Sequence, residues 1–221
     1  QIELRLMAHY SKDQIMLNSF KNNEDIHKRT ASEIFSVEME NVTDEMRRKA
    51  KTINFGLLYG MSAFGLSNQL SVSRAEAEEF LLNYFAKYSS IKVFMKDIVE
   101  QAKKDKYVST LYGRKIHVPN IESPNYMLRQ ASERAAVNGP LQGSAADIIK
   151  RAMINIFKES GKNKKDVKMI LQVHDELVFE VPKDYDEKNI SYLIDLMEES
   201  SSIDVPLKVE YGFGSNWREA H

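Results

Sequence analysis

The stretch RRKAKTINFGLLYG, from Arg47 to Gly60, constrains the fold of this chain more than any other part of the sequence. Thr43 is a good helix cap, and Asp44 and Glu45 follow it where the helix dipole favours acidic side chains. Glycine is common immediately after a helix end, so Gly60 is a natural stop. These features predict a helix over residues 44–59.

A ladder of four side chains runs along this predicted helix at steps of four: Arg47, Lys51, Phe55 and Tyr59. Residues four apart are neighbours on a helix surface, so one stripe presents two cations followed by two aromatic rings. A nucleoside triphosphate has the matching order, with a polyanion at one end and a flat base at the other. An amphipathic helix with core aromatics and solvated bases explains the same stripe, and the ladder alone leaves both interpretations open.

Helical patterns fill most of the first half of the chain. Ser11 with Gln14 has the spacing of a capping box and predicts a short helix to about residue 20. Ser73 with Glu76 has the same spacing and predicts a helix to about residue 88. We also expect helices over residues 25–35 and 90–104, and a small hairpin over 108–119 around Tyr112-Gly113.

The second half begins with a long helical pattern and changes to strands. Ser123-Pro124 favours a helix start, with the helix extending over residues 125–160. Pro140 lies inside this pattern and predicts a kink, because proline removes a backbone hydrogen bond and clashes with the preceding turn. After it we expect strands over 169–173 and 177–181, a helix over 186–200 and a last strand over 207–211.

The first residues alternate in character, since Ile2, Leu4 and Leu6 are separated by polar side chains. This alternation predicts a strand. Because a domain rarely begins within a strand, we expect the sequence to start inside a longer protein. Strands at both ends and helices between them indicate the α+β class. The expected architecture is an antiparallel, palm-like sheet formed from both ends, with helices and an all-helical insertion.

Charge and cysteine content narrow the function classes. The formal net charge of the 221 residues is −1, so any nucleic-acid site must be a local patch in a balanced surface. The chain has no cysteine, which excludes disulfides, thiolate metal sites and a cysteine nucleophile. No apolar run has the length of a membrane span, and no signal peptide is visible, so we expect no membrane partner.

Two adjacent acids, Asp175 and Glu176, follow His174 in the turn between the strands predicted over 169–173 and 177–181. Carboxylates suit a hard divalent ion such as Mg²⁺. Neighbours on a strand diverge, so a two-metal site needs another carboxylate from elsewhere, either Glu3 or an acid preceding Gln1. A polar turn with two solvated acids is the alternative interpretation.

A second ladder of four-residue steps, Arg134, Asn138 and Gln142, lies on the predicted long helix. Arginine and amide side chains can donate hydrogen bonds to base edges, sugars or phosphates. The predicted kink at Pro140 would help to aim Gln142. An ordinary polar helix face is the alternative. His27 is a candidate phosphate donor, with a surface histidine as the alternative.

Taken together, these segments resemble family A DNA polymerases of the bacterial DNA polymerase I type. The opening QIELR is similar to the first polymerase motif, usually DYSQIELR; RRKAKTINFGLLYG resembles the second, on the fingers helix; and VHDE resembles the third. The stretch ERAAVNGPLQGSAADIIK resembles the long helix beside the primer–template, and the ending GSNW also fits. The resemblance extends over essentially all 221 residues.

The resemblance implies a role for each candidate. Arg47 and Lys51 would hold the incoming triphosphate, with His27 assisting and Phe55 packing on the sugar and base. Phenylalanine at this position resembles members that discriminate against sugars lacking the 3′-hydroxyl. Tyr59 and Glu3 would exclude the 2′-hydroxyl. The remaining implied roles are minor-groove contacts for Arg134, Asn138 and Gln142, a place at the primer terminus for His174, and metal binding for Asp175 supported by Glu176.

The implied reaction is template-directed DNA synthesis, in which two Mg²⁺ ions assist nucleotidyl transfer from a dNTP to a primer 3′-hydroxyl. The partners would be primer–template DNA and dNTPs, the protein a monomer, and its location a bacterial cytoplasm or an organelle matrix. Residues 1–16 would be the truncated start of the palm, 17–128 the fingers and 129–221 the C-terminal palm. Because the first motif lacks its Asp and the thumb is absent, we expect the 221 residues alone to be inactive.

Two other interpretations fit the same sequence patterns. A non-catalytic nucleic-acid or nucleotide-binding module could retain the same fold. A helical structural protein could carry both ladders by coincidence. Dependence on metal and triphosphate separates a polymerase from a binding module.

Overall fold

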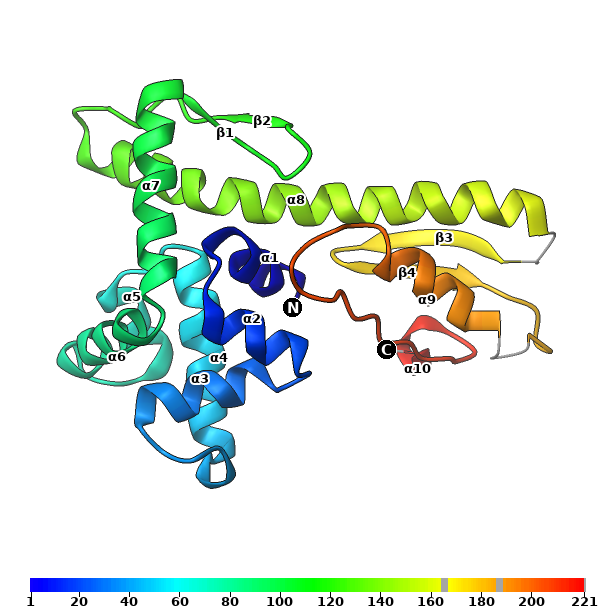
Figure 1. The fold of residues 1–221 in the computed structure, drawn as a ribbon, viewed down its shortest axis with the longest axis horizontal. Coiled ribbons are helices and arrows are strands. Elements are labelled where there is room, and N and C mark those ends of the chain that lie inside the picture. The colour runs from blue at the N-terminus through cyan, green and yellow to red at the C-terminus, as the bar shows by residue number, and fades with distance from the viewer. Residues whose placement is uncertain (164–166, 186–188, 221) are drawn as a thin grey trace. The chain divides into compact units, whose positions relative to one another are not determined.

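The computed structural model describes residues 1–163, 167–185 and 189–220 (Figure 1). The chain divides into two compact units. The first consists of Gln1 and Glu3–Ser144, and the second consists of Ile2 and the residues from Ala145 onward. The assignment of residues 17–128 to fingers and of the flanking residues to palm stays a prediction.

The first unit is mainly helical, as the blue to green ribbon in Figure 1 shows. Its elements are α1 (Ile2–Ser11), α2 (Gln14–Lys21), α3 (Ile26–Phe35), the 3-10 helix η1 (Met39–Asn41), α4 (Asp44–Leu58), α5 (Ala63–Leu70), α6 (Arg74–Lys87), α7 (Ser89–Asp105), β1 (Tyr107–Ser109), β2 (Lys115–His117) and the first part of α8 (Tyr126–Asn163). Helix α3 packs against both α4 and α6.

Side-chain caps fix most of the helix starts. Thr43 accepts a hydrogen bond from the Met46 amide at the start of α4, and the capping box of Ser73 and Glu76 at α6 is confirmed. At α2 the predicted helix is observed as Gln14–Lys21, but its predicted cap is wrong, because Asp13 caps the helix and Ser11 ends α1. At α8 the cap is Asn125, whose side chain accepts from the amides of residues 127 and 128.

The opening of the chain is helical, so the predicted strand there is wrong. The alternation that suggested a strand required Arg5 to face solvent, yet Arg5 is only 6% exposed. Its guanidinium lies 4.6 Å above the Phe20 ring and also donates to the Gln1 side chain. Leu4, Arg5 and Leu6 are all buried, and such burial on every side suits a helix inside a helical unit better than an alternating strand.

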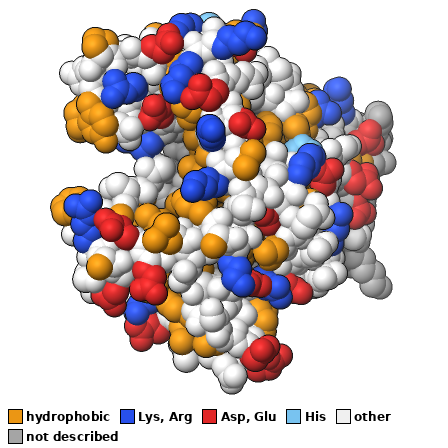
Figure 2. All heavy atoms as spheres, turned by 60° about the vertical axis from the view of Figure 1, so that its left-hand side comes forward, with side chains coloured by type: hydrophobic (Ala, Val, Ile, Leu, Met, Phe, Trp, Pro, Cys, Tyr) orange, Lys and Arg blue, Asp and Glu red, His pale blue; other side chains and the backbone are white. Residues whose placement is uncertain are grey.

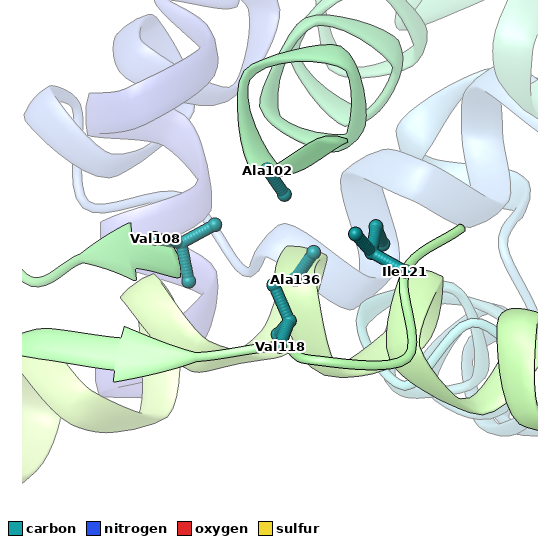
Figure 3. Close-up of a cluster of buried hydrophobic side chains, with 5 residues drawn as sticks. All are labelled: Ala102, Val108, Val118, Ile121 and Ala136. Carbon is teal, nitrogen blue, oxygen red and sulfur yellow. The ribbon is translucent and has the colours of Figure 1, made fainter. Parts of the chain in front are cut away.

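The predicted hairpin is confirmed. Strands β1 and β2 pair antiparallel, and Gly113 in the turn has φ 81°, a conformation that glycine adopts without strain. The hairpin packs on α7 and α8 through a cluster of buried apolar side chains, drawn in Figure 3: Ala102, Val108, Val118, Ile121 and Ala136. This cluster holds the first half of α8 in place within the first unit.

The second unit contains the rest of α8 with β3 (Lys168–Val173), β4 (Glu176–Glu180), α9 (Ile190–Glu198) and α10 (Trp217–Ala220). Strands β3 and β4 form the predicted antiparallel hairpin, with a register irregularity between Met169 and Leu171. The α9 region is fixed to α8 by hydrogen bonds from Tyr192 to Glu159 and from Arg151 to the Ser200 carbonyl.

The structure differs from two expectations for the second half of the chain. Residues 207–211 do not form the predicted strand; instead the Val209 amide donates to the Glu198 side chain. The predicted helix over 186–200 is observed as Ile190–Glu198, and residues 186–188 lie outside the described part of the chain. Helix α8 remains helical through Pro140, and the predicted kink stays a prediction.

The α+β class is confirmed, with two small antiparallel strand pairs beside many helices. In the described residues these strands come from positions 107–117 and 168–180, and neither residues 2–6 nor residues 207–211 contribute one. The predicted sheet formed from both ends of the chain is therefore absent from the described residues. None of the described helices is both long and apolar enough to cross a membrane.

Candidate functional site

The four-residue ladder lies on the outer side of α4. Lys51 and Tyr59 are exposed, while Arg47 and Phe55 are half-buried. The opposite side of the helix is buried and carries Ala50, Ile53, Asn54 and Leu57. The core aromatics of the alternative interpretation are therefore absent from this stripe, and both of its rings are accessible.

Arg47 at the start of the ladder pairs with an acid on α3. Its Nε donates to Oδ2 of Asp25 over 2.7 Å, and the other oxygen of Asp25 caps α3 by accepting from the His27 and Lys28 amides. Burial acts to raise the pKa of Asp25, but the hydrogen bonds from Arg47 and from the backbone lower it overall. Asp25 is thus an anion that orients Arg47 on the ladder.

His27 is buried beside the ladder, with 4% of its surface exposed. Its ring centroid is 5.7 Å from that of Phe55, and its Nδ1 is 3.1 Å from Nδ2 of Asn54. Burial lowers the pKa of His27 to about 4, so the ring is neutral at pH 7. The alternative of a surface histidine is excluded.

The end of α4 gathers residues from three helices of the first unit. The Tyr59 hydroxyl donates to the Glu3 carboxylate of α1 over 3.1 Å. Gly60 has φ 65°, and a Cβ at this position would lie 2.6 Å from Cγ of Arg134 on α8. The ladder on α4, Glu3 and the start of the second ladder therefore meet within one compact unit.

The second ladder follows on α8. Arg134 and Gln142 are exposed, whereas Asn138 is half-buried and its Oδ1 has no hydrogen-bond partner. A buried acceptor without a donor is costly. The ladder is accessible along one side of α8, as an interaction with a long ligand requires.

The predicted acidic pair lies in the second unit. His174 and Asp175 form the turn between β3 and β4, with His174 at φ 52°, and Glu176 begins β4. Two carboxylates are suitable in type for Mg²⁺. Among the described residues no group of three or more His, Cys, Asp or Glu side chains could hold a metal ion. The approach of Glu3 to Asp175 stays a prediction.

A family model for "DNA polymerase family A" matches residues 1–219. The chain belongs to this family. It is 49% identical over 224 residues to DNA polymerase I of Pseudomonas aeruginosa and 44% identical over 220 residues to that of Bacillus subtilis, covering 100% of the chain in each case. The chain spans about a quarter of the length of these relatives, 24% and 25% respectively.

A solved structure supports the same family A assignment. The chain is similar, with a TM-score of 0.95 and 43% identity, to the POL domain of Pol1 from M. smegmatis in complex with DNA primer-template and dNTP. The similarity covers 100% of this chain and 39% of that one. The resemblance based on motifs is thus confirmed at the level of the family.

Sequence reasoning missed three residues beside the candidate site: Asp25, which pairs with Arg47, Asn54, which contacts His27, and Thr30, which accepts from Asn54 over 3.0 Å. Asp25 was recognised only as the beginning of a helix, because its pairing with Arg47 spans 22 positions. Asn54 is 1% exposed on the apolar side of α4. A polar residue that interrupts an apolar helix face is the signal that could have identified Asn54, since such a group needs a buried partner.

Proposed function

We propose that the protein containing these 221 residues is a DNA-directed DNA polymerase, and that α4 is its nucleotide-binding helix. The observation that carries the proposal is the accessible order of charge and rings along α4: Arg47, Lys51, Phe55, Tyr59. The family membership and the primer–template and dNTP in the name of the similar structure support it.

In this proposal the phosphates of the dNTP bind to the cationic half of the ladder. The guanidinium of Arg47 and the ammonium of Lys51 offset phosphate charge, and His27 contributes a neutral N–H. Phe55 packs on the sugar and base. The Tyr59–Glu3 hydrogen bond closes the space beside the sugar and so excludes a 2′-hydroxyl.

DNA binds along the second ladder and near the hairpin of the second unit. Arg134, Asn138 and Gln142 donate or accept along the minor groove near the growing end, and the exposure of Arg134 and Gln142 supports such contacts. His174 would lie by the primer terminus. These roles come from the family resemblance and from exposure of the side chains.

The reaction is a phosphoryl transfer. The primer 3′-oxygen attacks the α-phosphorus, a P–O bond forms, the bond to pyrophosphate breaks, and the hydroxyl proton passes to solvent water. Asp175, with Glu176 beside it, would hold Mg²⁺, which lowers the pKa of a bound hydroxyl and offsets charge on the leaving group. Arg47 and Lys51 add positive charge beside the departing pyrophosphate.

The proposal is tested in the full-length protein with Lys51→Ala. Losing this charged contact should raise the KM for dNTP by roughly 10- to 100-fold and leave primer–template affinity nearly unchanged. Lys49→Ala is the matched control, because Lys49 is on the same helix but pairs with Glu45. Equal losses of nucleotide use and DNA binding would contradict the role of Lys51.

Asp175→Ala separates a polymerase from a binding module. We expect primer extension to be lost while the dNTP still binds, since the ladder on α4 is unchanged. Absence of any metal-dependent extension by the unaltered full-length protein would instead favour a non-catalytic nucleotide-binding module with the same fold.

A further inference from the structure

A chain of buried polar side chains runs from Tyr88 to His27 inside the first unit. Thr30 lies on α3 with His27, Asn54 on α4, and Tyr88 at the junction of α6 and α7. Their exposed fractions are 0% for Thr30 and Tyr88, 1% for Asn54 and 4% for His27. Buried polar groups must satisfy their hydrogen bonds within the protein, so the proton positions in this chain can be assigned.

Thr30 determines the direction of the hydrogen bonds. Its hydroxyl has one proton and two acceptors within reach, the Ile26 carbonyl at 2.8 Å and Oδ1 of Asn54 at 3.4 Å. The shorter contact takes the proton, so Thr30 donates to Ile26. Its oxygen must therefore accept from the other two neighbours, the Tyr88 hydroxyl at 3.3 Å and Nδ2 of Asn54 at 3.0 Å. With the Asn54 amide turned over, its oxygen would lie 3.0 Å from Thr30 and would compete for the proton that Thr30 donates to the Ile26 carbonyl.

The direction at Thr30 fixes the tautomer of His27. Because Asn54 presents its NH₂ group to Thr30, the same group faces Nδ1 of His27 at 3.1 Å and must donate to it. Nδ1 then carries no proton, and the proton of the neutral ring is on Nε2. Burial, which lowers the pKa of His27 to about 4, keeps the ring in this neutral form at pH 7.

The His27 ring lies beside the ladder on α4. It packs against Phe55, and Asp25, two residues before it, binds Arg47. Phosphate oxygens are acceptors, so a neutral imidazole can bind them only through an N–H. The Nδ1–H tautomer would instead turn a lone pair toward the phosphates, which is repulsive.

We propose that Asn54 is a positioning residue, which holds His27 as the Nε2–H tautomer so that this N–H donates to the phosphates of the incoming nucleotide. The inference rests on the proposed function for the identity of the ligand. Thr30 and Tyr88 anchor the Asn54 amide as part of the same hydrogen-bond chain.

The first test is spectroscopic and does not require activity. In full-length protein labelled with ¹⁵N-histidine, the ring signal that disappears in His27→Gln should show an unprotonated Nδ1 and a protonated Nε2 at pH 7. Asn54→Asp, which is isosteric and accepts where Asn54 donates, should move the proton to Nδ1 or add a second one. A protonated Nδ1 in the unaltered protein would overturn the proposal.

The second test is a kinetic double-mutant cycle. Asn54→Asp should raise the KM for dNTP by roughly 10-fold, as expected for a lost hydrogen bond to a charged group, with primer–template affinity unchanged. In a His27→Gln background the same substitution should cause no further rise, because the two residues act through one contact. Equal effects in both backgrounds, or an unchanged KM in His27→Gln, would overturn the proposal.

Two further variants keep the tests decisive if Asn54→Asp does not fold. Thr30→Val keeps its size but removes the anchor of the amide, and should mix the two tautomers and raise the KM for dNTP. Ile53→Val removes one methyl from a fully buried neighbour on α4 and should alter stability only. A protein that makes no DNA at all would refute the proposed function, and the ¹⁵N signals would then still decide whether Asn54 holds the ring.

Discussion

At the scale of single residues, Asp25 would compete with the nucleotide for Arg47 in the proposed function. Asp25 has two tasks, because one of its oxygens caps α3 and the other accepts from Arg47. A triphosphate that binds Arg47 must therefore displace, or share the guanidinium with, a carboxylate. The exposed fractions of the two side chains are 43% and 38%, so solvent screens this pair and makes it weak.

We predict that Asp25→Asn strengthens nucleotide binding. Asparagine caps a helix as well as aspartate does, so α3 should keep its start while Arg47 loses its anionic partner. Exposed ion pairs are worth about 0.2–1 kcal/mol, which corresponds to a KM for dNTP lower by up to about 5-fold. The measurement is dNTP titration of primer extension in the full-length protein.

Glu33→Gln is the matched control for this prediction. Glu33 is also on α3, but it pairs with Arg29 and Lys87, away from the ladder. The control should leave the KM for dNTP unchanged. A higher KM in Asp25→Asn would mean that Asp25 aids Arg47 in binding and does not compete for it.

At the scale of elements, helix ends were easier to predict than the character of buried segments. Thr43 and Ser73 act as caps because capping depends on residues only three positions apart. The segment Ile2–Leu6 was misassigned because its pattern depends on where Arg5 points. Arg5 is buried through its contact with Phe20, and that contact is invisible in a local window. Local chemistry therefore predicts boundaries, while tertiary packing decides the type of a short apolar segment.

Gly60, which follows the end of α4, lies close to Arg134 of the second ladder, and this approach leads to a prediction about DNA binding. Gly60→Ala adds a Cβ at φ 65°, which strains the backbone by about 1–2 kcal/mol. It also places that carbon 2.6 Å from Arg134 Cγ, so the Arg134 side chain must move. We expect lower thermal stability together with weaker primer–template binding.

Gly113→Ala separates these two effects. Gly113 has φ 81° in its own turn, and an added Cβ there has no atom within 4 Å. The control should therefore show the backbone strain but no loss of DNA affinity. If both variants bind primer–template DNA equally well, the contact of Gly60 with Arg134 does not position Arg134 for DNA.

At the scale of the whole molecule, the candidate residues are divided between the two compact units. The ladder on α4, Glu3 and Arg134 belong to the first unit, and Asp175 and Glu176 belong to the second. The sequence predicted each group separately, from four-residue steps and from the strand–turn–strand pattern. A meeting of these groups cannot be predicted from such patterns, because periodicity carries no information about contacts between residues 172 positions apart. That part of the prediction came from the ligand requirement of a two-metal site and from the family resemblance.

The approach of Glu3 to Asp175 is the last prediction, and the lack of cysteine in the 221 residues makes it directly testable. In the 221-residue chain, shown by circular dichroism to be folded, the pair Glu3→Cys and Asp175→Cys should be linked by a short bifunctional maleimide. In the control pair, Glu180→Cys replaces Asp175→Cys. Glu180 is at the other end of β4, roughly 16 Å from the turn at about 3.3 Å per residue. Because linking depends on local effective concentration, the first pair should react at least roughly 10-fold faster. Equal rates would show that Glu3 and Asp175 do not share a site.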